Sequence, residues 1–262
     1  MEILGYLASV LIGVSLGLIG GGGSILTVPV LVYLFKVEPV QATALSLFIV
    51  GLTSAIGSAS YFKQKLVNIP TVIMFGIPSI IAVYLTRAWI VPSIPKVIFQ
   101  MGDFVLSKNL LLMLLFAVLM VMASYSMIKP QKNTAQPPKS ASASMKYLIP
   151  ILEGSIVGIL TGLVGAGGGF LIIPALVIVS KLDMKTAVGT SLVIIALKSL
   201  IGFLGENLND LPWNLLLAVS FFSILGILIG SFLSQKIDGN KLKPAFGYFV
   251  LMMGIFIILK EL

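Results

Sequence analysis

Eight long apolar segments follow one another along the chain, and short stretches that hold most of the charges separate them. At about 1.5 Å per helical residue, these segments are long enough to span much or all of a hydrocarbon layer about 30 Å thick. The pattern therefore predicts an all-α, polytopic helical membrane protein. The segments are Leu4 to Phe35, Pro39 to Tyr61, Pro70 to Trp89, Leu110 to Ile128, Tyr147 to Ser180, Thr186 to Leu204, Pro212 to Ser234 and Lys243 to Leu259.

Two stretches outside these segments have a different character. Val91 to Lys108 contains prolines and charged residues, which predicts an interfacial connection with room for one short helix. Lys129 to Lys146 combines prolines with a run of Ser and Ala, a composition typical of a flexible, solvated linker. We therefore divide the chain into an N-terminal membrane repeat (1–128), a linker (129–146) and a C-terminal membrane repeat (147–262).

The division into repeats rests on an internal duplication. A shift of 145 positions places Gly17 to Gly23 on Gly162 to Gly168, and the register holds as far as Gly57 over Gly202. In this alignment 18 of 41 positions are identical, which indicates that one membrane unit occurs twice.

The most distinctive part of the duplicated unit is a glycine-rich interruption of its first apolar segment. Each glycine in a helix interior costs about 1 kcal/mol relative to Ala, so breaks are predicted at Gly20 to Gly23 and at Gly165 to Gly169. At membrane depth, non-helical backbone is tolerated only where it is buried in protein or lines a wet cavity. The two breaks are therefore expected to face each other at a shared site.

The distribution of positive charge favours one of two topologies. If each broken segment crosses the membrane once, the Lys and Arg residues divide almost equally between the two sides; if each is a re-entrant hairpin, they divide about eleven to five. Because cytoplasmic loops are enriched in Lys and Arg, we favour hairpins, with the linker cytoplasmic and both termini outside, in a plasma membrane protein. Each half then crosses three times, which makes the halves inverted repeats, as in many secondary transporters. One long tilted span for each broken segment is the open alternative.

Composition removes several classes of chemistry. The chain has no His and no Cys, which excludes imidazole acid–base catalysis, thiol nucleophiles and thiolate or imidazole metal sites, and we predict no cofactor and no metal. Its residues are 58% hydrophobic and 10% charged. The net charge of +8 lies mainly in short loops between apolar runs, so it indicates topology in a lipid bilayer and not binding of nucleic acid.

The helix starts after the two breaks are suited to anions. Such a start presents unpaired N–H groups and the positive end of the helix dipole. The alternative is that the glycines only let helices pack closely. Because four adjacent glycines are duplicated at matching positions, we favour loops that line a substrate site, and the candidate residues are Gly20, Gly21, Gly22, Gly23, Ser24, Gly165, Gly167, Gly168 and Gly169.

The duplicated pattern resembles the TauE/SafE sulfite exporter family, also called the toluene sulfonate uptake permeases. The resemblance covers nearly the whole chain and rests on each break being followed by a proline and then by a span with matching small and polar residues. Those residues are Pro29, Ala42, Ser46, Leu47 and Gly57 in the first repeat, and Pro174, Ala187, Ser191, Leu192 and Gly202 in the second.

The resemblance implies a secondary transporter, an exporter of small sulfur-containing anions such as sulfite or organosulfonates. The residues alone indicate only a transporter with anion-suited loops. A membrane enzyme, disfavoured by the lack of His and Cys, and a non-transporting membrane scaffold, disfavoured by the duplicated breaks, are the alternatives. Exact substrate, coupling ion and oligomeric state stay open.

Polar residues within the spans complete the candidate site. Lys198 lies about 9 Å inside its span, where an ammonium group is costly unless it is paired or hydrated. We predict that Lys198 binds the anion, and the alternative is that it extends to the lipid headgroups. Ser46, Thr53 and Ser191 add hydroxyl groups on the second span of each half. Glu153 is a candidate for a coupling proton or for an ion pair at the interface.

Overall fold

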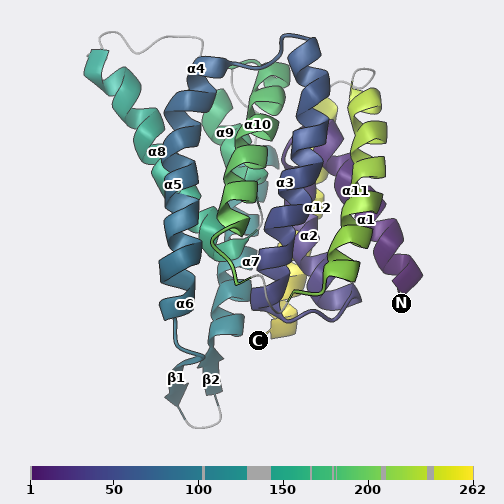
Figure 1. Cartoon of the computed structure of the whole chain (residues 1–262), viewed down its shortest axis with the longest axis vertical. Coiled ribbons are helices and arrows are strands. Elements are labelled where there is room, and N and C mark those ends of the chain that lie inside the picture. The colour runs from purple at the N-terminus through teal and green to yellow at the C-terminus, as the bar shows by residue number, and fades with distance from the viewer. Residues whose placement is uncertain are drawn as a thin grey trace.

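The computed structural model describes residues 2–101, 104–128, 143–165, 167–178, 180, 182–207, 211–234 and 239–261. Most of the predicted linker lies outside the described residues. Helices stand side by side in one bundle, and a small β hairpin extends from its lower end (Figure 1). The predicted all-α membrane architecture is confirmed. In chain order the elements are α1 (Glu2–Ile19), α2 (Gly22–Pro29), the π-helical turn η1 (Val30–Leu34), α3 (Pro39–Lys63), α4 (Ile69–Thr71), the π-helical turn η2 (Val72–Gly76), α5 (Ile77–Leu85), the π-helical turn η3 (Thr86–Ile90), α6 (Val91–Ser93), β1 (Val97–Met101), β2 (Phe104–Ser107), α7 (Lys108–Ile128), α8 (Ala143–Val164), α9 (Gly169–Ile178), α10 (Met184–Phe203), α11 (Trp213–Ser234) and α12 (Gly239–Glu261).

Five helical stretches among the described residues are long and apolar enough to cross a membrane. One of them, Ile69–Ser93, is continuous from α4 to α6 and contains the two π-helical turns η2 and η3. Pro78 follows η2 and lacks the N–H that a regular α-helical bond would need, which accounts for a local change of helical register there. The other four stretches are Pro39–Lys63, Lys108–Tyr125, Met184–Phe203 and Trp213–Ser234.

The interfacial connection after this span differs in part from the prediction. The short helix α6 is present, but strands β1 and β2 pair as an antiparallel hairpin where no strand was predicted. Val97 to Phe99 and Phe104 to Leu106 are short runs of β-branched, aromatic and aliphatic residues, which favour extended backbone. Two such runs close together in the sequence are sufficient for a hairpin.

The first broken segment folds back on itself. Helix α1 ends at Ile19, the chain turns at Gly20, and α2 with η1 returns along α1. Phe35, at the end of the returning arm, packs against Tyr6, with ring centroids 5.4 Å apart, and against Gly5. The start and the end of the segment are therefore neighbours, so the segment is a hairpin and not one long span.

The second broken segment turns back in the same way from the opposite end of the bundle. Figure 1 shows α8 descending from the upper left towards the middle, and α9 rising again beside α10. Both chain ends lie in the lower part of the same view, and α8 begins at the top. The two hairpins thus enter the bundle from opposite ends.

Each hairpin packs against the other half of the chain. On α1, Gly13 lies against Ser223 and Gly17 against Gly230, both on α11. On α8, the equivalent Gly158 lies against Ser79 of α5, and Gly162 lies against Thr86 at the start of η3. Glycine at these positions allows the close approach of helix backbones that small-xxx-small patterns provide in membranes.

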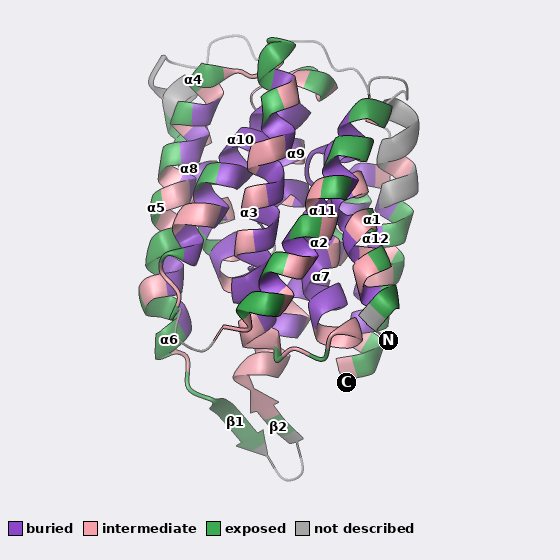
Figure 2. Ribbon diagram, turned by 45° about the vertical axis from the view of Figure 1, so that its right-hand side comes forward, coloured by how far each residue is buried: buried purple, intermediate pink, exposed green. Residues whose placement is uncertain are grey.

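Helices α3 and α10, the equivalent second spans of the two repeats, form the centre of the bundle. Gly51 of α3 lies against Leu200 of α10, and Gly57 lies against Leu192, so the two helices run antiparallel. They are the most buried of the apolar spans, and Figure 2 shows them largely purple. The hairpin breaks are held against these two helices.

Candidate functional site

The two glycine breaks meet where the hairpins pass each other. Gly21 and Gly169 pack backbone to backbone, and a Cβ atom on Gly21 would lie 2.5 Å from the carbonyl oxygen of Gly169. Both residues are buried. The meeting point is therefore enclosed by protein, as non-helical backbone at membrane depth requires.

The first break is held by hydroxyl groups that bond its own carbonyls. Gly20 adopts a φ of 75°, a conformation that glycine adopts without the steric cost of a side chain. Ser191 of α10 donates to the Gly20 carbonyl over 3.1 Å, and Ser24 donates to the Gly21 carbonyl over 2.6 Å. Gly22 begins α2, and Gly23 packs against α1. Ser24 and Ser191 thus stabilise the break itself.

The second break is surrounded by cationic and hydroxyl groups from three other helical segments. Gly165, Gly167 and Gly168 have φ values of 71°, 63° and 69°. Gly165 lies against Thr43 of α3 and against the Nη2 atom of Arg87. The remaining neighbours are Val50 and Ser199 at Gly167, and Thr161 and Lys198 at Gly168.

Lys198 is the buried ammonium group beside the second break. Its side chain is 0% exposed, and Nζ donates to the hydroxyl of Thr161 over 3.0 Å. A Cβ atom on Gly168 would lie 2.7 Å from this Nζ. Within the described residues, no carboxylate forms an ion pair with Lys198. Because the ammonium is buried inside the bundle, the alternative that it extends to the lipid headgroups is wrong.

Several hydroxyl groups on the two central helices lack hydrogen-bond partners. Ser46, Thr53 and Ser54 of α3 and Ser199 of α10 are fully buried, and within the described part of the chain their oxygen atoms accept or donate no hydrogen bond. A buried polar group left unsatisfied costs about 1 to 3 kcal/mol. These hydroxyls, two of them predicted from the sequence, are available to a polar ligand.

Arg87 lies beside Gly165, the first residue of the second break, whereas Lys198 lies beside Gly168. Its Nη1 donates to Thr43 over 2.9 Å and to the Oε1 atom of Glu206 over 2.8 Å. Arg87 is 1% exposed, and its Nε and Nη2 atoms have no partner among the described residues. One edge of the guanidinium group is therefore paired, and the other is not.

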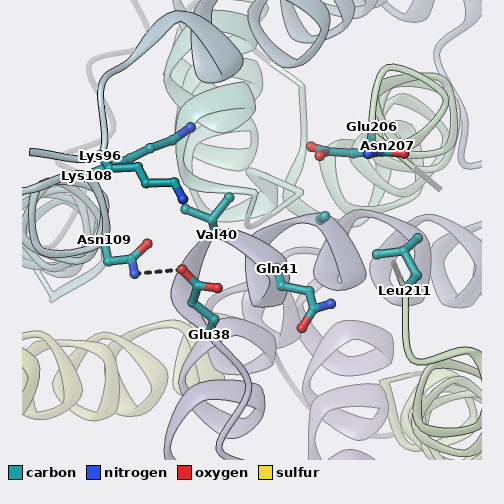
Figure 3. Close-up of a pocket in the computed structure, with 10 residues that line it drawn as sticks. Glu38, Val40, Gln41, Lys96, Lys108, Asn109, Glu206, Asn207 and Leu211 are labelled. Atoms are coloured by element: carbon teal, nitrogen blue, oxygen red, sulfur yellow. Dashed lines mark hydrogen bonds between the residues drawn. The ribbon is translucent and has the colours of Figure 1, made fainter. Parts of the chain in front are cut away.

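A pocket of about 410 Å³ opens to the surface next to this ion pair (Figure 3). Its lining includes Glu206, Lys96 and Lys108, together with residues of the α3 start. In Figure 3 the two lysines extend from one side towards the carboxylate of Glu206 on the other, with Val40 between them. Glu206 therefore lines the pocket and holds Arg87 behind it.

The described residues contain no group of three or more His, Cys, Asp or Glu side chains arranged to hold a metal ion. The polar groups at the breaks are instead ammonium, guanidinium and hydroxyl groups. These groups bind anions through charge-assisted and neutral hydrogen bonds.

Comparison with known proteins places this architecture in a family. Residues 5–257 match the model of the sulfite exporter TauE/SafE family. The chain belongs to the TauE/SafE sulfite exporter family. It is similar to a probable membrane transporter protein of Xylella fastidiosa (strain Temecula1), with 29% identity over 95% of this chain and 91% of that protein.

Two further relatives of this TauE/SafE chain come from other organisms. They are the probable membrane transporter protein MJ0441 of Methanocaldococcus jannaschii, 29% identical over 95% of this chain and 92% of that protein, and YunE of Bacillus subtilis, 28% identical over 99% and 94%. No solved structure matches. The family and the relatives identify the chain as a multi-pass membrane transporter.

Two features of this TauE/SafE chain bear on the sequence predictions. The sequence predicts no role for Arg87, because it lies two residues before Trp89, the predicted end of its span, where cations normally belong to the interface. The apolar residues that continue to Val91 were the available signal. Glu153, by contrast, is half-buried on α8 about 18 Å before the second break, so it does not join the site.

Proposed function

We propose that this chain is a secondary transporter that exports small sulfur-containing anions, such as sulfite or organosulfonates, across the plasma membrane. The substrate site lies at the two glycine breaks. The observation that carries the proposal is the fully buried ammonium of Lys198, which has a hydroxyl partner and no carboxylate partner among the described residues. Removing one ion from water costs several kcal/mol, and a bound anion offsets part of that cost.

The surroundings of Lys198 suit a small oxyanion. The unpaired hydroxyl of Ser199 lies beside Gly167, the residue before Gly168, and the buried hydroxyls of Thr53 and Ser46 on α3 are further candidate donors. The family description names a sulfite exporter, and sulfite carries three oxygen acceptors for such donors. A small anion of this kind would be held by one cation and several hydroxyls.

The arrangement of the two halves supports an alternating-access mechanism. Equivalent helices α3 and α10 run antiparallel, and each hairpin packs on the opposite half. These relations support inverted repeats, which we assign to residues 1–128 and 147–262, with the linker at 129–146 between them. Rocking of one half against the other would expose a central site to each side in turn.

We also propose the orientation of the bundle in the membrane. The end where α3 finishes and α10 begins includes Lys63, Lys65 and Lys185, and the predicted linker lies between α7 and α8. Because positive residues accumulate on the cytoplasmic side, this end is cytoplasmic and both termini are outside. Fusions of a periplasmically active reporter to the C-terminus should be active, and a cytoplasmically active reporter there would contradict the orientation.

Flux measurements test the substrate. Full-length protein in liposomes should release preloaded radiolabelled sulfite much faster than protein-free liposomes do. Radiolabelled acetate, with a planar carboxylate, should leave at the protein-free rate. Equal release of both anions, or no release of sulfite above the control, would overturn the proposed substrate.

A further inference from the structure

A buried arginine with an open edge lies between the surface pocket and the second glycine break. Glu206 approaches the guanidinium of Arg87 through one nitrogen, Nη1, which it shares with the hydroxyl of Thr43. The Nε and Nη2 atoms are buried and have no partner within the described residues. Nη2 lies against Gly165, the first residue of the second break.

This geometry is incomplete as a structural ion pair. A guanidinium group binds a carboxylate most strongly through two parallel N–H donors, and an oxyanion with two or more oxygens can bind the same way. Here only Nη1 donates to Glu206. Nε and Nη2, which together form one two-donor edge of the guanidinium, have no acceptor among the described residues. The open edge fits an anion with at least two oxygens on one atom, such as sulfite or a sulfonate.

The paired edge of Arg87 leads to the pocket. The Glu206 side chain is 13% exposed, whereas that of Arg87 is 0% exposed. Lys96 and Lys108 face Glu206 across the pocket, which Glu38 also lines, so an anion that enters there has two ammonium groups near it as well as the two carboxylates. Glu206 therefore separates the cations of the pocket from the guanidinium behind it.

The equivalent place at the first break has no such pair. Ser79 and Ser223 occupy equivalent positions in the packing of the two hairpins, and eight residues further along the chain stand Arg87 and Ser231, respectively. The shift of 145 positions makes Tyr61 the equivalent of Glu206. Tyr61 donates to the carbonyl of Gly17 and contacts the hydroxyl of Ser234, over 3.2 Å in each case. The backbone arrangement there is held by neutral hydrogen bonds, so an ion pair is not required to close a break of this shape.

We propose that Arg87 is a second oxyanion subsite, and that Glu206 is the carboxylate that the substrate displaces when it passes between the pocket and the second break. The passage of an anion through this subsite rests on the proposed transport function, whereas the ability of the subsite to bind an anion depends only on the Arg87 guanidinium. It is distinct from Lys198, because the two cations lie beside different residues of the break, Arg87 beside Gly165 and Lys198 beside Gly168.

Binding measurements on the full-length protein in detergent test the displacement. Glu206→Gln removes the competing charge and keeps Arg87, so sulfite affinity should rise about tenfold. Arg87→Gln/Glu206→Gln removes both charges of the pair together, which avoids an uncompensated buried charge, and the gain should disappear. Equal sulfite affinity of these two variants would overturn the subsite and leave a structural ion pair.

A second measurement does not depend on sulfite transport. The chain has no cysteine, so Val40→Cys introduces one reactive thiol between the pocket lysines and Glu206. Its reaction with a sulfonate-bearing methanethiosulfonate is compared with its reaction with a trimethylammonium-bearing one, in the Glu206→Gln background. Addition of Arg87→Gln should lower the ratio of anionic to cationic rates about tenfold. An unchanged ratio would overturn the subsite. If the ratio changes but the wild-type protein does not bind sulfite, the result would count against the proposed substrate and not against the subsite.

Discussion

The two glycine breaks share a backbone design but differ in the charges around it. Gly20 and Gly165 occupy equivalent positions, have φ values of 75° and 71°, and pack against the equivalent residues Val188 and Thr43. The side chains around them diverge. Near the first break stand Leu16, Tyr61 and Ser231, and the equivalent residues near the second are Thr161, Glu206 and Arg87. Lys198, beside Gly168, has Thr53 as its equivalent in the first repeat.

This difference separates what the fold needs from what the function needs. Positive φ angles and close helix packing occur at both breaks, so these features stabilise the fold independently of substrate binding. Buried cations occur beside the second break and not at the equivalent positions of the first. Substitutions at equivalent positions in the two halves are therefore matched controls for each other.

The largest difference is expected at the equivalent positions Lys198 and Thr53. Lys198→Met should weaken sulfite binding about a hundredfold, because it removes the cation that offsets the burial of the anion. The same variant should melt at a higher temperature without ligand, because an ammonium lacking a carboxylate partner is no longer buried. Thr53→Val, the control, should change the affinity about threefold at most, the scale of one neutral hydrogen bond.

Equilibrium binding and ligand-free thermal unfolding of both variants measure these effects. A Lys198→Met protein that binds sulfite as tightly as the wild type would remove Lys198 from the site. Lys198→Arg retains the charge and should bind with intermediate affinity, since the larger guanidinium must fit beside Gly168.

How much of this arrangement can be predicted from the sequence depends on whether the signal is local. The helices follow from long apolar runs, and the breaks follow from adjacent glycines that few helices tolerate. Lys198 stands out because charge is rare within such a run. Its partner Thr161 lies 37 positions away in the chain, so no local pattern links the two residues.

The features that the sequence did not predict depend on tertiary structure, either because an element extends beyond its predicted end or because the residues involved are far apart in the chain. The span containing Arg87 continues through the π-helical turn η3 to Ser93, which carries the guanidinium inside the bundle instead of into a loop. The hairpin of β1 and β2 is too short to give a periodic signal. The Arg87 ion pair with Glu206 joins residues 119 positions apart and therefore required the structure.

An intermediate difference in stability is expected between Gly165→Ala and Gly20→Ala. Both substitutions place a Cβ atom at positive φ, which costs about 1 to 2 kcal/mol. At Gly165 the Cβ would also meet the Thr43 backbone and the buried Arg87, whereas at Gly20 its nearest neighbour is the Val188 side chain, 2.6 Å away. Gly165→Ala should therefore destabilise the protein by about 1 kcal/mol more than Gly20→Ala does. The Thr43 backbone and the buried Arg87 cannot move away from the new Cβ atom as easily as a Val188 methyl group can.

Thermal unfolding of the two variants in the same detergent measures this difference. A third variant, Gly165→Ala/Thr43→Gly, removes the Cβ atom of Thr43 that the new methyl group would meet, so Gly165→Ala should cost less stability when it is added to Thr43→Gly than when it is added to the wild type. Equal destabilisation by the two single substitutions would mean that the φ angle alone determines the cost.

The smallest effect is expected at Tyr61, which stands near the first break where Glu206 stands near the second. Tyr61→Phe removes a donor to the carbonyl of Gly17 and a contact with Ser234, and should lower the free energy of unfolding by about 1 kcal/mol. Sulfite affinity should stay within about twofold, because this hydroxyl contacts the Gly17 carbonyl and Ser234 and, among the described residues, no cation. At the second break, by contrast, Glu206→Gln should raise sulfite affinity about tenfold. Parallel unfolding and binding curves for the two variants test the contrast, and a large loss of sulfite affinity in Tyr61→Phe would show that both breaks, and not the second alone, contact the anion.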